Sequence, residues 1–344
     1  MLRETIRLHM NEMPYLPAQD VIEAARKSLS NLNRYADPAE LEELRGLLAG
    51  YCGVSKHHVF PSPGSDLLLR EVIHSFSKGR KVVMVSPSFF PTVQAATKFA
   101  TERLSIRLSP PAFQLNLELL MNALEGPSLV IIDNPNNPTG RMLLDSPAVE
   151  ALLQQRQTLL VIDEAYYEFS GVTFADMVAD HPQLAVIRTM DKAFSLAGAR
   201  IGYGIAGEAF RRALSSFHTI LPYPSLCAAM EALRQPDYMR KNVRRVVEER
   251  ERLWQMLDEL GVHVHPSSTN FLLVRAEIPE LVTQLREAGV FVSDVSNQLP
   301  LGFFRVSVGT PAENDAFVGA LAQRIREFSS ASDSRARKFH SASR

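Results

Sequence analysis

The sequence predicts an α/β protein with a mostly parallel central sheet and a smaller C-terminal α+β domain, on three observations. Short apolar runs alternate with segments of helical spacing from about residue 57 to residue 206. Several runs are apolar at successive positions, which is typical of strands buried on both faces. Beyond residue 227 a long charged helix and shorter strands follow. The alternation indicates parallel strands joined by helices that cover both faces of the sheet.

Each element of this fold has a sequence signal of its own. The candidate strands of the large sheet are HHVF (57–60), KVVMVS (81–86), LSIRL (104–108), LVIID (129–133), LLVID (159–163), AVIRT (185–189) and RIGYGIA (200–206). Segments with helical spacing lie between most of them. One such segment places its apolar side chains at Leu68, Leu69, Val72, Ile73 and Phe76.

The C-terminal part has a different pattern. A charged helix is expected from roughly Asp237 to Leu260, and another near residues 278–288. The candidate strands are FLLVR (271–275), VFVS (290–293) and FFRVSV (303–308). Thr310-Pro311-Ala312-Glu313 has the form of a capping box with proline at the first helical position, so it predicts the start of the last helix.

These patterns divide the chain into four parts. Residues 1–33 are expected to form an N-terminal arm that contributes to the small domain. Residues 34–226 form the large domain, and residues 227–328 form the small C-terminal domain. The segment 329–344 is rich in Ser, Arg and Ala without periodicity, so we expect a disordered tail.

The composition gives no sign of a nucleic-acid, membrane or metal partner. Apolar residues make up 46% and charged residues 22% of the chain, and the net charge is −1, which gives no electrostatic reason to expect nucleic acid or a membrane. Cys52 and Cys227 lie in no metal or redox spacing, so reduced thiols and no metal site are expected. The first residues lack the apolar stretch of a signal peptide, which predicts a cytoplasmic protein.

Four short segments carry candidate chemistry. Lys192 follows the strand AVIRT and precedes a run of small residues, although a loop lysine is more often a surface charge. Asp163 ends the strand LLVID, where ligands of open α/β sheets bind, although an isolated Asp there is more often a helix cap. NPNNPTG (134–140) predicts a rigid turn. PGSD (63–66) opens a helix whose free N–H groups favour an anion.

Together these segments resemble the fold-type I aminotransferases, which depend on pyridoxal 5′-phosphate, and most closely their histidinol-phosphate branch. The matching segments run in the family's order and span nearly the whole chain: NEMPYLP (11–17), RYADP (34–38), PGSD (63–66), NPNNPTG (134–140), DEAYYEF (163–169), RTMDKAFSLAGARIGY (188–203) and FRVSVGTPAEN (304–314).

The resemblance implies a role for each residue around the cofactor ring. Lys192 carries the cofactor as a Schiff base and then moves a proton as base and acid. Asp163 pairs with the pyridine nitrogen, so the ring can accept electrons. Asn137 and Tyr166 donate to the phenolic oxygen, and Phe89 stacks on the ring.

The cofactor phosphate is implied to rest on a second group of residues. These are the backbone of Ser65 and Asp66, the hydroxyl of Thr189 and the guanidinium of Arg200, which follows the lysine by eight residues. Tyr35 resembles a tyrosine that reaches the phosphate in the neighbouring subunit's site, which implies a homodimer with shared active sites. A tyrosine packed beside a helix start is the structural alternative for this residue.

The substrate end of the site follows the family less closely. Arg305 matches an arginine that holds the substrate's anionic group, and Tyr15 and Asn137 are also expected to contact substrate. Ser293 stands where the histidinol-phosphate enzymes commonly have a second arginine, which weakens the case for a phosphorylated substrate. Asp191 replaces a serine that helps to bind the cofactor phosphate, and a carboxylate there is unfavourable unless it turns toward a donor such as Arg200.

The resemblance favours transamination of L-histidinol phosphate with 2-oxoglutarate, giving imidazole acetol phosphate and L-glutamate in histidine biosynthesis. An aminotransferase for an aromatic or other neutral amino acid is the first alternative. A phosphothreonine-type decarboxylase shares the scaffold, and KAFSLAG (192–198) favours the transaminase. A ligand sensor without catalysis is also conceivable, but the complete set of cofactor residues speaks against it.

Overall fold

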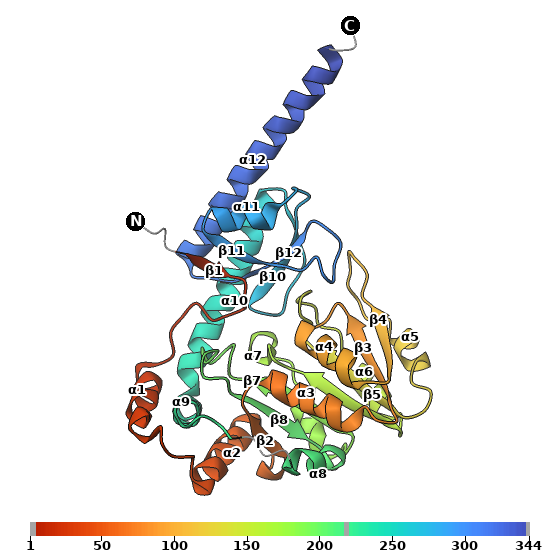
Figure 1. The fold of residues 1–344 in the computed structure, drawn as a ribbon, viewed down its shortest axis with the longest axis vertical. Helices are drawn as coiled ribbons and strands as arrows, with labels where there is room; N and C mark the ends of the chain where they lie inside the picture. Colours follow the sequence, from red (N-terminus) through yellow and green to blue (C-terminus); the bar gives the residue numbers. More distant parts are fainter. Residues whose placement is uncertain (1–4, 217–219, 342–344) are drawn as a thin grey trace. The chain divides into compact units, whose positions relative to one another are not determined.

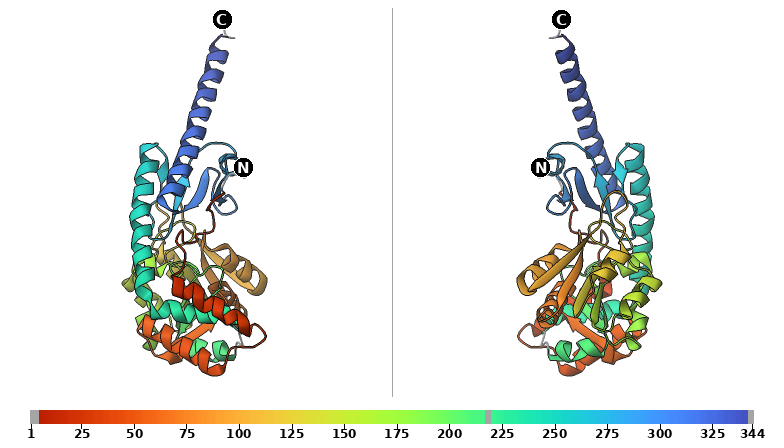
Figure 2. Two further views of the ribbon diagram at one scale, coloured as in Figure 1. Left: turned by 90° about the vertical axis from the view of Figure 1, so that its left-hand side faces the viewer. Right: turned by 90° about the vertical axis from the view of Figure 1, so that its right-hand side faces the viewer.

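The computed structural model describes residues 5–216 and 220–341. Its internal contacts divide the chain into two compact units, drawn as ribbons in Figures 1 and 2. The larger unit consists of Tyr15–Arg245 and Ser267–Thr269. The smaller unit consists of Met1–Pro14, Val246–Pro266 and Asn270–Arg344.

A seven-stranded sheet forms the centre of the larger unit, with the strand order β2-β8-β7-β6-β5-β3-β4. Among the described strands of this sheet, β8 pairs antiparallel with β2 and with β7, and the other pairs are parallel. The bounds are β2 Val59–Ser62, β3 Lys81–Ser86, β4 Glu102–Arg107, β5 Ser128–Asp133, β6 Thr158–Asp163, β7 Leu184–Thr189 and β8 Gly202–Ala206. Every residue of β5, β6 and β7 is buried, as the continuous apolar runs predict.

Helices surround this sheet. Their bounds are α1 Gln19–Ser28, α2 Pro38–Cys52, α3 Ser65–Phe76, α4 Phe90–Phe99, α5 Leu117–Asn122, α6 Ser146–Leu153, α7 Tyr167–Ser170, α8 Glu208–Ser216 and α9 Tyr223–Arg234, with short 3₁₀ helices at Leu29–Asn31, Lys56–His58 and Ala175–Ala179. Apolar side chains of α3, α4 and α8 form one core cluster with alternate residues of the strands. This arrangement confirms the predicted fold class.

The boundary between the units differs from the one that the sequence suggests. Residues 15–33 and 227–245 belong to the larger unit, because α1 and α2 both pack against α9. The start of α2 is capped by its own side chains: Asp37 accepts from the Ala39 N–H at 2.8 Å, and Glu40 accepts from the Asp37 N–H at 2.8 Å. Helix packing, which leaves little trace in composition, therefore decides where the larger unit ends.

The smaller unit is built on a five-stranded sheet with the order β1-β11-β12-β10-β9. Its elements are β1 Ile6–Leu8, β9 His263–Val264, β10 Phe271–Arg275, α11 Leu281–Glu287, β11 Val290–Asp294, β12 Phe303–Ser307 and α12 Pro311–Ser341. The long helix α10 Pro236–Glu259 belongs to this unit from Val246 onward. Strand β1 pairs with β11 in parallel, and the remaining pairs are antiparallel. One apolar cluster joins this sheet to α10, α11 and α12.

The last helix is longer than expected. The Glu313 side chain accepts from the Thr310 N–H at 2.7 Å, which confirms the predicted capping box. The helix then continues to Ser341, so residues 329–341 are helical where we expected a disordered tail (Figure 1). Elongating an existing helix needs no new nucleus, and Ala and Arg are good helix formers. Residues 342–344 lie outside the described residues.

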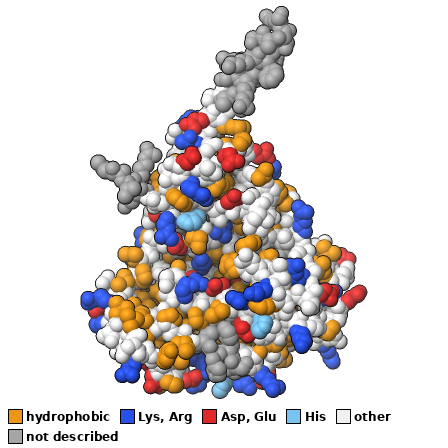
Figure 3. Space-filling view, viewed as in Figure 1, with side chains coloured by type: hydrophobic (Ala, Val, Ile, Leu, Met, Phe, Trp, Pro, Cys, Tyr) orange, Lys and Arg blue, Asp and Glu red, His pale blue; other side chains and the backbone are white. Residues whose placement is uncertain are grey.

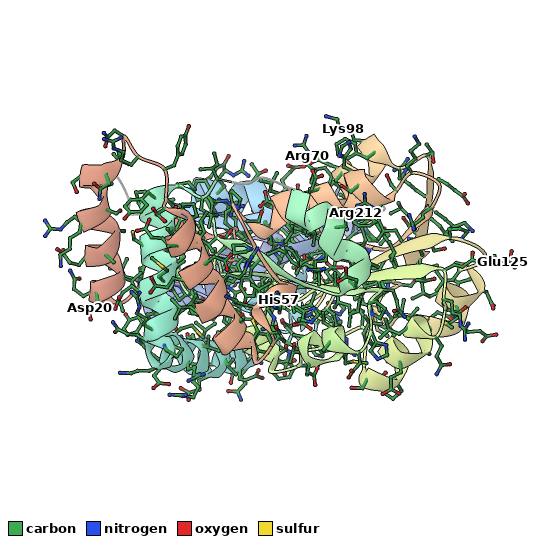
Figure 4. All side chains as sticks on the ribbon, turned by 90° about the horizontal axis from the view of Figure 1, so that it is seen from below. Asp20, His57, Arg70, Lys98, Glu125 and Arg212 are labelled. Carbon is green, nitrogen blue, oxygen red and sulfur yellow. The ribbon has the colours of Figure 1, made fainter. Side chains whose placement is uncertain are left out.

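The face of the molecule shown in Figure 3 carries charged side chains of both signs. Arg70 and Lys98 lie side by side in Figure 4, and both cations approach the Phe99 ring, at 5.6 and 5.5 Å from its centroid. Among the described residues, no helix combines the length and the apolar character that a membrane crossing requires. The same residues contain no group of three or more His, Cys, Asp or Glu side chains placed to hold a metal ion.

Candidate active site

Two carboxylates stand at the ends of neighbouring strands of the large sheet. Asp133 ends β5 and Asp163 ends β6, and the parallel register pairs them directly. Each is 5% exposed. Because the carboxyl ends of parallel strands meet at one edge of a sheet, this edge is where a ligand of an open α/β fold is expected.

The surroundings of Asp163 act on the pKa of its carboxyl in opposite directions. Its Oδ1 accepts from the Ala165 N–H at 3.0 Å. Burial raises its pKa to about 7, with the charge of Asp133 as the next cause, against the opposing effects of the Ala165 N–H and Lys192. A cation brought to this carboxyl would shift the balance toward the ionised form.

Asp133 was not singled out by the sequence, yet it organises the loops around Asp163. Its Oδ2 accepts from the Asn137 N–H at 2.8 Å. Its Oδ1 accepts from the Asn136 amide at 2.9 Å and from the Ser88 hydroxyl at 3.0 Å. Burial outweighs these bonds and raises the pKa of Asp133 to about 6. The available signal was an acidic residue at the end of a second apolar strand, directly before the asparagine loop.

The NPNNPTG loop is fixed by its own side chains. The Asn134 side chain accepts from the N–H groups of Leu143 and Leu144 at 2.7 and 3.0 Å. Asn137 points its amide at the Tyr166 hydroxyl, at 3.5 Å. The two side chains to which the family resemblance gives one shared role therefore lie next to each other, and both are buried.

Lys192 lies in a tight loop between β7 and β8. The Ser195 N–H donates to the Lys192 carbonyl at 3.0 Å, and the Met190 N–H donates to the Ile201 carbonyl at 2.8 Å. Ser195 and Arg200 have φ angles of 60° and 56°, a left-handed conformation that costs a side-chain-bearing residue about 1–2 kcal/mol. Such strain persists where the surroundings fix the backbone, and it gathers at functional sites.

Arg200 is clamped between two carboxylates. Its guanidinium pairs with Asp66 at 2.5 Å and with Asp191. Asp191 thus turns toward Arg200, the orientation in which a carboxylate at this position is tolerable. The Oδ1 atom of Asp191 is buried, and among the described residues it has no hydrogen-bond partner. The three charges sum to −1, so the guanidinium is already compensated before any anion arrives.

Backbone packing beside Arg200 makes a narrow cradle. A Cβ on Gly64 would lie 2.5 Å from Asp66 Oδ1 and 2.6 Å from an Arg200 nitrogen, and a Cβ on Gly202 would lie 2.2 Å from the Ser65 nitrogen. Gly64 is the N-cap of α3 and has no side chain that could bond to the first N–H groups of the helix, so a ligand can accept from them. The cradle fits a phosphate group, which matches helix N–H groups and a guanidinium.

The Thr189 hydroxyl faces the same loop but is engaged within it. It donates to the Ile201 carbonyl at 3.2 Å and accepts from the Asp191 N–H at 3.0 Å. A phosphate oxygen would have to compete with the Ile201 carbonyl for its only proton.

A buried ion pair lies directly after these strand ends and was also missed by the sequence analysis. Arg188 is 1% exposed and pairs with Glu164 at 2.9 Å. Its guanidinium carbon lies 3.7 Å from the centroid of the Tyr167 ring, and its other donors reach Thr173 and Cys52. The pair joins the residue after Asp163 to the residue before Thr189. The signal was a charged residue inside the apolar run AVIRT.

The other predicted residues occupy varied environments. Phe89 is partly buried at the start of α4 and packs on the core cluster. Tyr35 is 81% exposed. Tyr15 has the Arg245 guanidinium 3.7 Å from its ring centroid. Arg305 belongs to the smaller unit, where it donates to the His9 carbonyl at 2.8 Å and lies 5.2 Å from the Phe271 ring centroid.

The larger unit thus combines a mostly parallel sheet with two buried carboxylates at its strand ends, the Lys192 loop and the Arg200 cradle. Residues 3–321 match the family model of aminotransferase class I and II, and the chain belongs to this family.

Individual relatives agree with this assignment. The chain is 36% identical to histidinol-phosphate aminotransferase from Sulfurisphaera tokodaii, over 94% of this chain and 91% of the relative. It is 35% identical to histidinol-phosphate aminotransferase 1 from Archaeoglobus fulgidus, over 92% and 98%. The crystal structure of the Sinorhizobium meliloti histidinol-phosphate aminotransferase in complex with pyridoxal-5′-phosphate is similar, with a TM-score of 0.85, 28% identity and coverage of 95% and 92%.

Proposed function

We propose that this protein is a pyridoxal-phosphate-dependent aminotransferase that transfers the amino group of L-histidinol phosphate to 2-oxoglutarate. The observation that carries the proposal is the buried Asp163 at the end of β6, in the same unit as the Lys192 loop and the Arg200 cradle. Curated relatives named histidinol-phosphate aminotransferase, up to 36% identical over 94% of the chain, support the choice of substrate.

The residues present fit the cofactor at each of its ends. Asp163 would pair with the pyridine nitrogen, and the positive charge of the protonated nitrogen would favour the ionised form of this buried carboxyl. Asn137 and Tyr166 would donate to the phenolic oxygen from their adjoining positions. Phe89 would cover one face of the ring, where an aromatic side chain stacks without adding a hydroxyl.

The phosphate would occupy the cradle. The N–H groups of Ser65 and Asp66 lie at the start of α3, and Arg200 contributes its planar fork. Thr189 can add its hydroxyl after releasing the Ile201 carbonyl. Asp66 and Asp191 then remain beside the phosphate and orient the guanidinium.

Catalysis rests on the proton that must move at the substrate's Cα. The bound cofactor supplies a conjugated ring that accepts the electron pair left at Cα. The Lys192 amine would take the proton from Cα as a base and deliver it to the cofactor's C4′ as an acid. Asp163 would keep a proton on the pyridine nitrogen, and the Asn137 and Tyr166 donors would stabilise negative charge on the phenolic oxygen.

We also propose that the enzyme works as a cytoplasmic homodimer with shared sites. The exposure of Tyr35 supports this arrangement, because a large aromatic side chain that is 81% exposed in one subunit is available to a second. Light scattering should give twice the mass of 38.3 kDa. A Tyr35→Phe variant should bind cofactor more weakly while remaining a dimer. A monomer with full activity contradicts the shared site.

A spectral titration tests the reaction. L-Histidinol phosphate, L-glutamate, L-phenylalanine and phosphothreonine are added separately to the holoenzyme, and conversion of the cofactor to its amine form is followed by absorbance. We expect conversion with histidinol phosphate and glutamate. Rapid conversion with phenylalanine and none with histidinol phosphate contradicts the proposed donor. Release of CO₂ from phosphothreonine, without a 2-oxo product, indicates a decarboxylase.

A further inference from the structure

One buried guanidinium contacts both ends of the turn that carries Tyr166. This turn runs from Glu164 to Tyr167, and the Tyr167 N–H closes it by donating to the Glu164 carbonyl at 3.0 Å. Glu164 pairs with Arg188 at 2.9 Å, and the Tyr167 ring centroid lies 3.7 Å from the Arg188 guanidinium carbon. Only Ala165 and Tyr166 lie between the two residues that Arg188 contacts.

The Glu164 end of the turn is fixed by several hydrogen bonds. Its carboxylate oxygens accept from Arg188 Nε at 3.0 Å, from the Thr173 hydroxyl at 2.9 Å and from the Phe174 N–H at 2.7 Å. Its own N–H donates to the Ile187 carbonyl of β7 at 2.8 Å. Both the backbone and the side chain of Glu164 are therefore tied to β7, and the side chain is also tied to the loop after α7.

Arg188 lies inside the larger unit, and its side chain is 2% exposed. Burying a guanidinium costs free energy unless its donors find partners. Its remaining donors reach the Thr173 hydroxyl and the Cys52 sulfur, the latter at 3.6 Å. Well-packed apolar side chains often stabilise a protein as much as a buried ion pair does. Stability alone therefore gives no reason for a charged pair here, whereas a planar fork can orient the groups that it contacts.

Tyr166 depends on this turn for its position. The residue is 4% exposed, and its hydroxyl lies 3.5 Å from the amide nitrogen of Asn137. It stands directly before α7 with φ −117° and ψ 19°, which belong neither to a helix nor to a strand. Because no regular element fixes this backbone, a shift of Glu164 or Tyr167 would move the Tyr166 hydroxyl.

We propose that Arg188 is a positioning residue that orients the Tyr166 hydroxyl toward the phenolic oxygen of the cofactor, acting through Glu164 and Tyr167. This inference rests on the proposed function, in which Tyr166 donates to that oxygen. A hydrogen bond to the phenolic oxygen stabilises its negative charge. It thereby weakens the attraction of that oxygen for the proton on the nitrogen that links Lys192 to the cofactor.

A purely structural role makes a different prediction. If the ion pair only stabilises the fold, its loss should lower the free energy of unfolding and leave the titration of the bound cofactor unchanged. If Arg188 orients Tyr166, loss of the fork should raise the pH at which the nitrogen that links Lys192 to the cofactor loses its proton. The midpoint of this titration is read from the absorbance of the holoenzyme without any substrate, so the identity of the amino donor does not affect it.

The test compares single substitutions in the holoenzyme. Tyr166→Phe removes the donor and should raise the midpoint by about one pH unit, the effect of one hydrogen bond to an ionised group. Arg188→Lys keeps the charge but loses the planar fork, and Tyr167→Leu loses the stacked ring. Each should raise the midpoint by about half a pH unit. Tyr167→Phe is the matched control, because it keeps the ring and should leave the midpoint unchanged.

Double substitutions show whether Arg188 acts through Tyr166. In a Tyr166→Phe protein no hydroxyl is left to orient, so adding Arg188→Lys or Tyr167→Leu should shift the midpoint no further. A shift of the same size with and without the hydroxyl overturns the proposal, because Arg188 would then act on the cofactor by another route. Tyr167→Leu leaves the buried charges paired, so the test does not depend on whether Arg188→Lys folds.

The outcomes separate this inference from the proposed function. If Tyr166→Phe raises the midpoint but Arg188→Lys and Tyr167→Leu do not, the inference is overturned and the proposed function stands. If Tyr166→Phe leaves the midpoint unchanged, the inference and the proposed role of Tyr166 are both contradicted. If all the expected shifts appear in a protein that does not act on L-histidinol phosphate, the inference stands and only the proposed amino donor is wrong.

Discussion

The negative charges of two carboxylate pairs in the larger unit are compensated by different groups. Asp66 and Asp191 share the Arg200 guanidinium in a region where Arg200 and Asp66 are nearly half exposed. Asp133 and Asp163 are both buried at neighbouring strand ends, and hydrogen bonds and the charge of Lys192 take the place of a paired guanidinium.

The difference follows from what each pair has to bind. A phosphate brings negative charge, so the cradle needs a cation that is already oriented. A protonated pyridine nitrogen is a cation, so the strand ends need a carboxyl that ionises when this cation lies beside it. Burial and a neighbouring carboxylate raise the pKa of Asp163, and the pyridinium charge would lower it again.

The largest effect should come from removing the charge at the strand ends. Asp163→Asn keeps the shape of the side chain but cannot hold a proton on the ring nitrogen. We expect kcat to fall on the order of 10³-fold, comparable to the loss of a strong electrostatic contact in the transition state. Cofactor content is checked by absorbance in the same sample. A fully loaded variant that keeps more than a tenth of the wild-type kcat contradicts the role of Asp163.

The same pair should make the stability of the apoenzyme depend on pH. The pKa values of Asp133 and Asp163 are raised from 3.8 to about 6 and about 7. The folded apoprotein therefore binds protons more tightly than the unfolded chain between about pH 4 and 7. The stabilisation is complete below the unfolded pKa and is lost as the pH rises through the folded values, at up to ~1.4 kcal/mol per pH unit for each group.

Asp133→Asn isolates this effect, because it removes one charge and lowers the pKa of Asp163. Urea unfolding from pH 4 to 8 should show the variant gaining stability relative to wild type as the pH rises. Ser88→Ala is the control, since it removes one hydrogen bond to Asp133 and keeps the charge. Parallel stability curves for Asp133→Asn and wild type would be inconsistent with a proton held by the pair.

A substitution in the cradle should change the affinity for the cofactor more than the kcat of the loaded enzyme. Arg200→Ala removes the only cation that either carboxylate contacts among the described ion pairs. We expect the Kd for pyridoxal phosphate to rise about 100-fold, because two charged hydrogen bonds are lost and two carboxylates are left facing the phosphate. Fluorescence titration of the apoenzyme measures this. A rise below 3-fold, a threshold of ~0.65 kcal/mol, means that the phosphate lies elsewhere.

The smallest effect concerns Asp191. Replacing it with serine removes a buried negative charge beside the phosphate and restores a hydroxyl donor, so the Kd for pyridoxal phosphate should fall by about 5-fold, on the order of 1 kcal/mol. The same fluorescence titration applies. Weaker binding in this variant would mean that Asp191 serves mainly to orient Arg200, and the cradle would then resemble the strand ends in depending on a carboxylate.

The sequence was sufficient for parts of the molecule that depend on local signals. Strand β3 begins and ends where its apolar run does, and the caps at Asp37 and Thr310 follow from residues three apart. The grouping of Asn137 with Tyr166 came from motif order, and the structure places their side chains together.

The remaining features depend on contacts that no local pattern contains. Asp133 matters because it bonds to Ser88, which lies 45 residues earlier in the chain. In the sequence, Arg188 and Glu164 are charged residues within or next to apolar strands and have no evident partner. Their ion pair becomes evident only when β6 and β7 lie side by side in the sheet. The continuation of α12 to Ser341 depends on the helix that precedes it as well as on the Ala and Arg residues of its last part.

The most direct test of the central claim is to locate the cofactor on the chain. The holoenzyme is treated with borohydride, which makes the link between lysine and cofactor permanent, and its peptides are mapped by mass spectrometry. We predict a single pyridoxyl group, on the peptide that contains Lys192, and none in a Lys192→Ala protein treated in the same way. A pyridoxyl group on another lysine of the wild-type enzyme, or no modified peptide from a fully loaded sample, contradicts the assignment of Lys192.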